Sequence, residues 1–127
     1  MSALSPSDTT RKLAEDRYHA AVESLANGDL TAAIHGFRAS LEADPAFADA
    51  AHGLIHALKD ATEYDEAVAV AQQLIAADPD DVLAHTSLSI LYQHQGKIAE
   101  AEAEATRAKL LGWKKQLREE AAPGNSG

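Results

Sequence analysis

The chain repeats itself with a period of 34 residues, and this feature constrains its fold more than any other. Ala33 is followed at that interval by Ala67 and then by Ala101. The dipeptide Asp44-Pro45 returns 34 residues later as Asp78-Pro79. The same interval relates three further sets, which are Leu30 with Tyr64 and Ile98, Leu54 with Leu88, and Leu58 with Tyr92. A period of this length predicts an array of equivalent supersecondary units, and the matches define three of them.

Each unit is predicted to consist of two helices joined by a short turn. Gly28 follows the first amphipathic segment, and glycine can adopt the left-handed conformation that ends a helix. Asp44 precedes a proline, which disfavours the helical conformation of the residue before it and so predicts the end of the second helix. The six helices are expected over residues 13–26, 30–43, 48–60, 64–77, 81–94 and 98–111.

Composition supports an all-α fold. Apolar residues make up 46% of the chain, but aromatic residues make up only 5%, and alanine is abundant. Small side chains let helices approach closely, whereas strands favour branched and aromatic residues. Because helices of this length are marginal alone, packing between neighbouring units must supply their stability.

These residues resemble the tetratricopeptide repeat, a helix–turn–helix family with the pattern W-x2-L-G-x2-Y, then A-x3-F, then P. The third unit matches the first half of the pattern with His85, Leu88, Ser89 and Tyr92. The second unit has Ala51, Leu54, Ile55 and Leu58 at the same positions. The first unit matches the second half of the pattern with Ala33, Phe37 and Pro45. The resemblance implies a right-handed α-solenoid of three repeats over about 14–47, 48–81 and 82–113. Other helical-hairpin repeats are the alternative, and they would change the architecture little.

The two ends of the array are expected to differ from its middle. Trp113 and Leu117 lie four residues apart in a charged segment that follows Gly112, which predicts a short C-terminal capping helix over about 113–121. Residues 11–121 are expected to form a single domain. A flexible N-terminus is predicted for 1–10 and a disordered tail for 122–127.

Charge and cysteine content restrict the possible functions. The chain has 11 basic and 20 acidic residues, a formal charge of −9, which argues against nucleic acids and anionic membranes as partners. The absence of cysteine excludes disulfides, thiolate metal sites and cysteine nucleophiles. Neither a secretory signal nor an apolar run of about 20 residues is visible, so a cytoplasmic protein is expected. No phosphate loop or nucleophile elbow is present, and we predict neither enzymatic activity nor a cofactor.

The resemblance implies a binding groove lined by the first helix of each repeat. Its positions correspond to Tyr18, Val22 and Leu25 in the first repeat, His52, His56 and Lys59 in the second, and Thr86, Ile90 and Gln93 in the third. Only Lys59 is cationic, which disfavours the capture of acidic C-terminal tails of chaperones. The apolar stripe in the first repeat favours an amphipathic helix or an extended apolar segment as the guest. The predicted function is a protein–protein interaction module, acting as an adaptor or as an accessory subunit of a larger complex.

Two other functions are left open by the sequence. The apolar stripe could be covered by the chain's own N-terminal residues or by a second copy of the chain, and a second copy would make the protein mainly a self-associating oligomer. His52 and His56 are four residues apart, a spacing that can place two imidazoles on one metal ion. The pair lacks the glutamate of the zinc-protease motif, so a polar groove lining is the preferred interpretation of these histidines.

Overall fold

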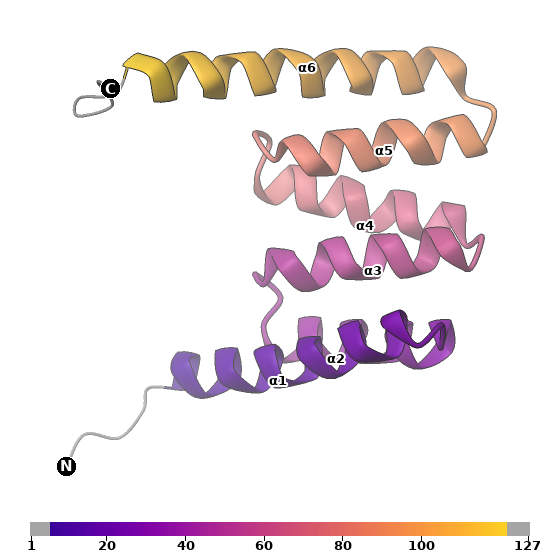
Figure 1. Ribbon diagram of the computed structural model, residues 1–127, viewed down its shortest axis with the longest axis vertical. Coiled ribbons are helices and arrows are strands. Elements are labelled where there is room, and N and C mark those ends of the chain that lie inside the picture. The colour runs from indigo at the N-terminus through magenta and orange to yellow at the C-terminus, as the bar shows by residue number, and fades with distance from the viewer. Residues whose placement is uncertain (1–5, 122–127) are drawn as a thin grey trace. The chain divides into compact units, whose positions relative to one another are not determined.

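The computed structural model describes residues 6–121, and within them the only regular elements are six α-helices (Figure 1). The helices are α1 (Pro6–Ala26), α2 (Leu30–Ala43), α3 (Ala48–Asp60), α4 (Tyr64–Ala77), α5 (Val82–His94) and α6 (Ile98–Ala121). Four of the six predicted helices have the expected bounds or differ from them by one residue. The prediction of an all-α repeat fold is therefore confirmed. The flexible segment expected at 1–5 and the disordered tail expected at 122–127 lie outside the described residues.

The first helix begins earlier than the sequence pattern indicated. We expected residues 1–10 to be flexible, but residues 6–10 belong to α1. Proline is tolerated at the first position of a helix because its missing N–H would have no intrahelical acceptor there. Pro6 therefore starts the helix, and the apolar periodicity that begins further along marks only the part of α1 that packs against its neighbours.

The last helix continues past the point where we expected it to end. Gly112 lies inside α6 and has no left-handed backbone conformation, so the predicted capping helix over 113–121 is the second half of α6 and not a separate element. A glycine ends a helix only where the chain turns at a positive φ, and an isolated glycine within a helix costs about 1 kcal/mol relative to alanine. Figure 1 shows the yellow end of α6 running past α5.

The turns within the three hairpins have the same backbone geometry. Gly28 and Gly96 have φ of 79° and 76°, and Thr62, midway between them in sequence, has φ of 61°. In each turn, the N–H of the following residue donates to a carbonyl five residues earlier, as in Asp29 to Ser24 at 2.9 Å and Lys97 to Tyr92 at 2.8 Å. This is the Schellman arrangement that satisfies the last carbonyls of a helix. The sequence period is thus also a period of backbone structure.

The loops between hairpins repeat in the same way. The Asp44 carboxylate accepts from the Ala46 N–H at 3.0 Å, and Asp78 accepts from Asp80 at 3.1 Å. Each aspartate precedes a proline and closes a tight turn that leads into the next helix. The Asp-Pro dipeptides therefore act as predicted.

The chain divides within α4 into two compact units, residues 1–71 and 72–127. The single domain that we predicted over 11–121 stays a prediction. In the first unit α2 packs on α1, and α3 packs on both. Small residues allow the close contact between α1 and α2, since Ala21 and Ala33 are buried and the Ser40 hydroxyl donates to the Ala14 carbonyl at 2.6 Å. Phe37 fills the centre of this unit and is fully buried.

The second unit is built around the hairpin of α5 and α6. Ala101 and Ala108 on α6 and Leu88 and Ser89 on α5 are buried in this hairpin. The Ser89 hydroxyl donates to the Ala101 carbonyl at 2.7 Å. A second link comes from α4, where the Gln72 amide donates to the Tyr92 hydroxyl at 3.2 Å. No helix within residues 6–121 is both long enough and apolar enough to cross a membrane.

Candidate functional site

The predicted groove residues of the first repeat lie on α1, and they differ in how much they are exposed. Val22 is exposed, whereas Tyr18 and Leu25 are half-buried. The Tyr18 ring centroid lies 5.2 Å from that of Phe47 and 5.8 Å from that of Phe37. Tyr18 therefore joins α1 to the start of α3, so that only part of its ring can meet a guest.

The predicted residues of the second repeat lie on α3. His56 is exposed, and its Nε2 lies 3.3 Å from the Asp60 carboxylate. His52 and Lys59 are half-buried. Across residues 6–121, no group of three histidine or carboxylate side chains is arranged to hold a metal ion. A zinc site normally takes at least three protein ligands, so the described part of the chain gives the histidine pair no third ligand.

The predicted residues of the third repeat lie on α5 and line a hollow surface. Gln93 is exposed, and Thr86 and Ile90 face a furrow between α5 and α6. We call this the α5–α6 furrow. Its first hollow has a volume of about 340 Å³ and is lined by Val82, Thr86, Ser89, Ile90, Ala105, Ala108 and Lys109. Its second hollow, of about 490 Å³, adjoins the first through Val82 and Thr86 and is also lined by Asp78, Asp80, Asp81, Leu83 and Lys115.

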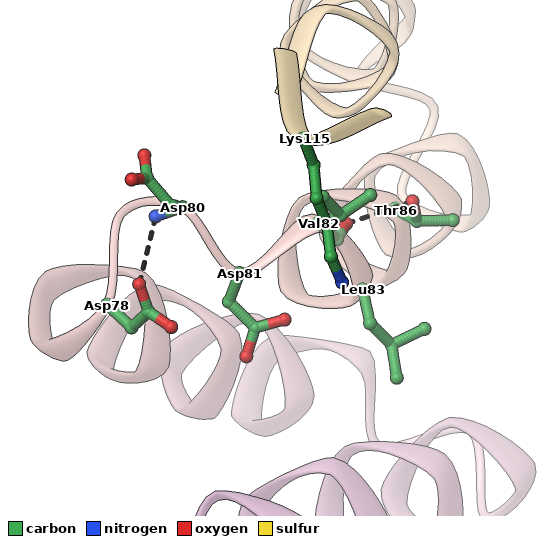
Figure 2. A pocket seen from close by; sticks show the side chains of 7 residues that line it. All are labelled: Asp78, Asp80, Asp81, Val82, Leu83, Thr86 and Lys115. Carbon is green, nitrogen blue, oxygen red and sulfur yellow. Dashed lines mark hydrogen bonds between the residues drawn. The ribbon is translucent and has the colours of Figure 1, made fainter. Parts of the chain in front are cut away.

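Figure 2 shows that the second hollow carries opposite charges on its two sides. Lys115 reaches down from α6 toward Val82, and the three aspartates come from the loop between α4 and α5. Two of these aspartates also stabilise the backbone, because Asp78 closes the turn and Asp81 accepts from the Ala84 N–H at 3.0 Å as the N-cap of α5. The furrow thus has an acidic loop at one end and lysines along its α6 side.

The sequence did not predict the α6 side of this furrow. Lys115 was expected on a separate capping helix, because α6 was predicted to end at residue 111. Lys109 lies on a second helix, and the resemblance assigned the groove to first helices only. The signal that was available is the unbroken helical composition from Ala105 to Arg118, in which Gly112 stands alone.

Comparison with known proteins agrees with the repeated geometry of turns and hairpins. Residues 24–89, about half of the chain, match the family model for the tetratricopeptide repeat. The chain belongs to the tetratricopeptide repeat family. No curated protein matches its sequence.

Several solved tetratricopeptide repeat structures have a similar fold. A crystal structure of MamA has a TM-score of 0.78 and 23% identity, and the match covers 82% of this chain but only 61% of the MamA chain. The second such domain of Spaghetti (RPAP3), bound to the HSP90 peptide SRMEEVD, has a TM-score of 0.77 and 21% identity over 83% of this chain and 96% of that one. The TPR2B domain of yeast Sti1, in a complex with pHsp70, has a TM-score of 0.77 and 19% identity over 85% and 86%. At these identities the likeness shows the fold alone.

The third tetratricopeptide repeat has a buried polar cluster at the position where the family pattern has tryptophan. His85 on α5 is buried, and its Nδ1 lies 2.7 Å from the Glu104 carboxylate on α6. Its Nε2 lies 2.7 Å from the Pro79 carbonyl. Arg107 forms an ion pair with the other oxygen of Glu104. The cluster therefore ties α5, α6 and the loop before α5 together.

The protonation state of His85 follows from its partners. A backbone carbonyl can only accept a hydrogen bond, and an ionised carboxylate can only accept as well, so both ring nitrogens must carry protons. Burial is the largest single influence and lowers the His85 pKa. The hydrogen bonds to Glu104 and Pro79 and the charge of Glu104 outweigh burial and the charge of Arg107, and they raise the pKa above its ordinary value of 6.5. His85 is thus a structural cation, and the cluster is too enclosed to receive a ligand.

Proposed function

We propose that this chain is a protein–protein interaction module that holds a helix or an extended peptide of a partner against the first helices of its repeats. In this proposal it acts as an adaptor or as an accessory subunit of a larger complex. The observation that carries the proposal is that the nine positions predicted for the groove all remain accessible, since none of them is buried. Two of them, Thr86 and Ile90, line the α5–α6 furrow.

Membership of the tetratricopeptide repeat family supports this proposal, and so do two similar structures. The Spaghetti domain was solved with an HSP90 peptide and the yeast Sti1 domain with pHsp70. Both complexes show that a fold of this kind can hold a segment of another protein. Fold does not name the guest, however, so the nature of the partner must come from the residues of this chain.

We further propose that the chain has no enzymatic activity of its own and resides in the cytoplasm. The acidic side chains near helix starts have structural uses, such as the Asp29 carboxylate, which accepts from the Ala32 N–H at 3.1 Å as the N-cap of α2. His85 and Glu104 are held by each other in the hairpin interior. A formal charge of −9 argues against a nucleic acid partner.

The test compares one double groove variant, which combines Val22→Ser with His56→Ala, with a control variant on a second helix. In Val22→Ser and His56→Ala, exposed side chains are removed from α1 and α3, and both changes lie outside the α5–α6 furrow. His35→Ala removes an exposed histidine from α2. Partners that co-purify with the tagged chain from its source cells are quantified by mass spectrometry. We expect the double groove variant to lose most of its bound partner and the control to keep it, and equal retention by both variants would contradict the proposal.

A second candidate, self-association, is favoured by one specific observation. Leu110, Trp113 and Leu117 are 55%, 53% and 65% exposed, and their spacing places them on one face of α6. We call this set the α6 apolar stripe. Exposed apolar groups in such an arrangement often mark an interface. The molecular mass in solution separates this candidate from the first.

A further inference from the structure

The lining of the α5–α6 furrow has a counterpart in the first hairpin. Because the hairpins repeat, each residue that lines the first hollow corresponds to a residue two repeat periods earlier. The correspondence is Val82 with Ala14, Thr86 with Tyr18, Ser89 with Ala21, Ile90 with Val22, Ala105 with Phe37, Ala108 with Ser40, and Lys109 with Leu41. The furrow is therefore the same surface of its hairpin as the one these earlier residues form on α1 and α2.

In the first hairpin that surface is covered by a helix. Phe47, just before α3, and Ala50 in its first turn are buried in a cluster with Ala14, against which Tyr18 and Leu41 also pack. The Arg11 guanidinium lies 4.0 Å above the Phe47 ring. The first hairpin thus shows what this surface accepts, which is the start of an amphipathic helix that brings one large apolar side chain.

The last hairpin differs from the first at the points that would touch such a helix. Thr86 and Ala105 stand where the first hairpin has tyrosine and phenylalanine, and these smaller side chains border the hollow of about 340 Å³. On α3 the residue that meets Phe37 is Gly53, where any Cβ would overlap the phenylalanine ring. Large side chains on a hairpin are therefore matched by small ones on the covering helix. A helix that covers the last hairpin needs the reverse, with a large apolar side chain opposite Ala105.

The charge around the furrow further defines the covering helix. The segment from Ala105 to Arg118 contains five basic residues and no acidic one, although the whole chain has a net charge of −9. Arg107 is paired with Glu104. Within residues 6–121, Lys109, Lys114, Lys115 and Arg118 form no ion pair with a carboxylate. Lys109 and Lys115 border the furrow itself. The Lys109 Nζ lies 5.1 Å from the centroid of the Trp113 ring, and because neither lysine is paired with a carboxylate in the described part of the chain, their positive charge favours carboxylates on an incoming helix.

We propose that the α5–α6 furrow binds an amphipathic helix of a partner protein that carries a large apolar side chain and acidic residues. The apolar side chain fills the hollow beside Ala105, and the acidic residues face Lys109 on α6, because Lys115 shares its hollow with Asp78, Asp80 and Asp81. The end of the helix near Asp78, Asp80 and Asp81 is neutral or basic, because acidic residues there would be repelled. This inference rests on the proposed function. It specifies a surface that shares Thr86 and Ile90 with the predicted groove and extends onto α6, together with the chemistry of its partner.

Other occupants fit these features less well. Residues 122–127 contain no large apolar side chain that could fill the hollow. In a second copy of the chain, the exposed apolar groups of the α6 apolar stripe sit on a helix segment that is itself basic, so it would be repelled by Lys109 and Lys115. A net charge of −9 also makes two copies repel each other at long range.

The covering helix of the first hairpin provides the probe for an experiment. The probe is a labelled synthetic peptide of residues 45–60 with two changes. Gly53→Leu supplies the bulk that Ala105 leaves room for, and Ala50→Glu places a carboxylate in the cluster that contains Ala14 and against which Leu41 packs, two positions occupied by Val82 and Lys109 in the last hairpin. Binding to the full chain is measured by fluorescence anisotropy. We expect the doubly changed peptide to bind at least about tenfold more tightly than the unchanged peptide.

Matched variants of the chain locate the binding surface. Ala105→Phe restores the side chain of the first hairpin and fills the hollow, whereas Ala103→Phe adds the same ring to an exposed position on α6 that does not line the furrow. Lys109→Glu reverses a charge at the furrow, and Lys114→Glu reverses one outside it. We expect each furrow variant to weaken peptide binding at least about tenfold and each control to leave it within about twofold. Circular dichroism checks that all four variants fold.

Three results would overturn the inference. The first is the absence of binding by the changed peptide, and the second is an equal loss of binding in the Ala105→Phe and Ala103→Phe variants. The third is a dimer of the chain that Ala105→Phe abolishes, because the occupant would then be a second copy. Each is distinguishable from a failure of the proposed function, since Val22→Ser and His56→Ala leave the furrow intact. If those variants lose the native partner and the furrow binds no peptide, the result would support the groove alone.

Discussion

At the scale of single residues, the His85 cluster makes the last hairpin sensitive to pH. Its imidazole must carry both protons to donate to Glu104 and Pro79, and its pKa in the folded chain is raised above 6.5. A group with a raised folded pKa stabilises the fold fully below its unfolded pKa, and this contribution is lost as the pH rises through the folded pKa. Deprotonation leaves one ring nitrogen facing an acceptor without a hydrogen between them.

We therefore predict that the chain is less stable in mild alkali than in mild acid. The free energy of unfolding should fall by on the order of 1 kcal/mol between about pH 5.5 and about pH 9. In His85→Gln this part of the pH dependence should disappear, whereas His35→Gln on the exposed face of α2 should keep it. Urea denaturation at both pH values measures the difference. An unchanged pH profile in His85→Gln would show that the histidine is not charged in the folded chain.

Thr62 carries a second residue-scale prediction. It has φ of 61° in the turn where the other two hairpins have Gly28 and Gly96. A β-branched residue is strained in this conformation by about 1–2 kcal/mol, whereas glycine is not. Thr62→Gly should therefore raise the melting temperature, with a net gain of about 0.5–1 kcal/mol after the extra entropy of glycine in the unfolded chain. The converse change Gly28→Thr should lower the melting temperature. A loss of stability in both variants would show that Thr62 is not strained.

At the scale of helices, two glycines have opposite roles that can be compared directly. Gly112 lies inside α6, and a Cβ there would contact nothing within 4 Å. Gly36 lies inside α2, and a Cβ there would lie 2.8 Å from the Ala21 Cβ across the hairpin. Gly112→Ala should stabilise the chain by about 1 kcal/mol through helix propensity alone. Gly36→Ala should destabilise it, because the two helices must separate. Thermal melting of both variants tests this, and gains in both would mean that α1 and α2 can move apart without cost.

The comparison of these helices with the sequence shows which signals were sufficient. Gly28 and Gly96 end helices, and the Asp-Pro dipeptides close the loops, because each also provides backbone hydrogen bonds that a turn requires. Gly112 is not part of such a turn, and α6 continues through it. The pairing of His85 with Glu104 could not be predicted, because it depends on which faces of α5 and α6 meet and not on spacing along the chain. Lys109 and Lys115 were missed as furrow residues for the same reason.

At the scale of the whole molecule, the part of the chain that the structure describes has three accessible surfaces that differ in character. The predicted groove lies on the first helices, the α5–α6 furrow has basic residues along one side, and the α6 apolar stripe is exposed. The first two are proposed to bind partners. The α6 apolar stripe decides between an interaction module and a self-associating protein. An exposed apolar stripe favours dimerisation with a second copy of the chain unless charge repulsion opposes the contact.

We predict that repulsion between positive charges prevents dimerisation through the α6 apolar stripe. The stripe is flanked by Lys109, Lys114 and Arg118, so two copies that meet through it bring these cations together. Light scattering at about 50 μM in moderate salt should therefore give the monomer mass of 13.4 kDa. High salt screens the repulsion, and any dimer that forms there should be abolished by Trp113→Ser but not by Ala103→Ser, which changes α6 outside the stripe. Trp113 is the only tryptophan, so its fluorescence reports directly on burial of the stripe. A dimer in moderate salt that Trp113→Ser dissolves would make self-association the primary function.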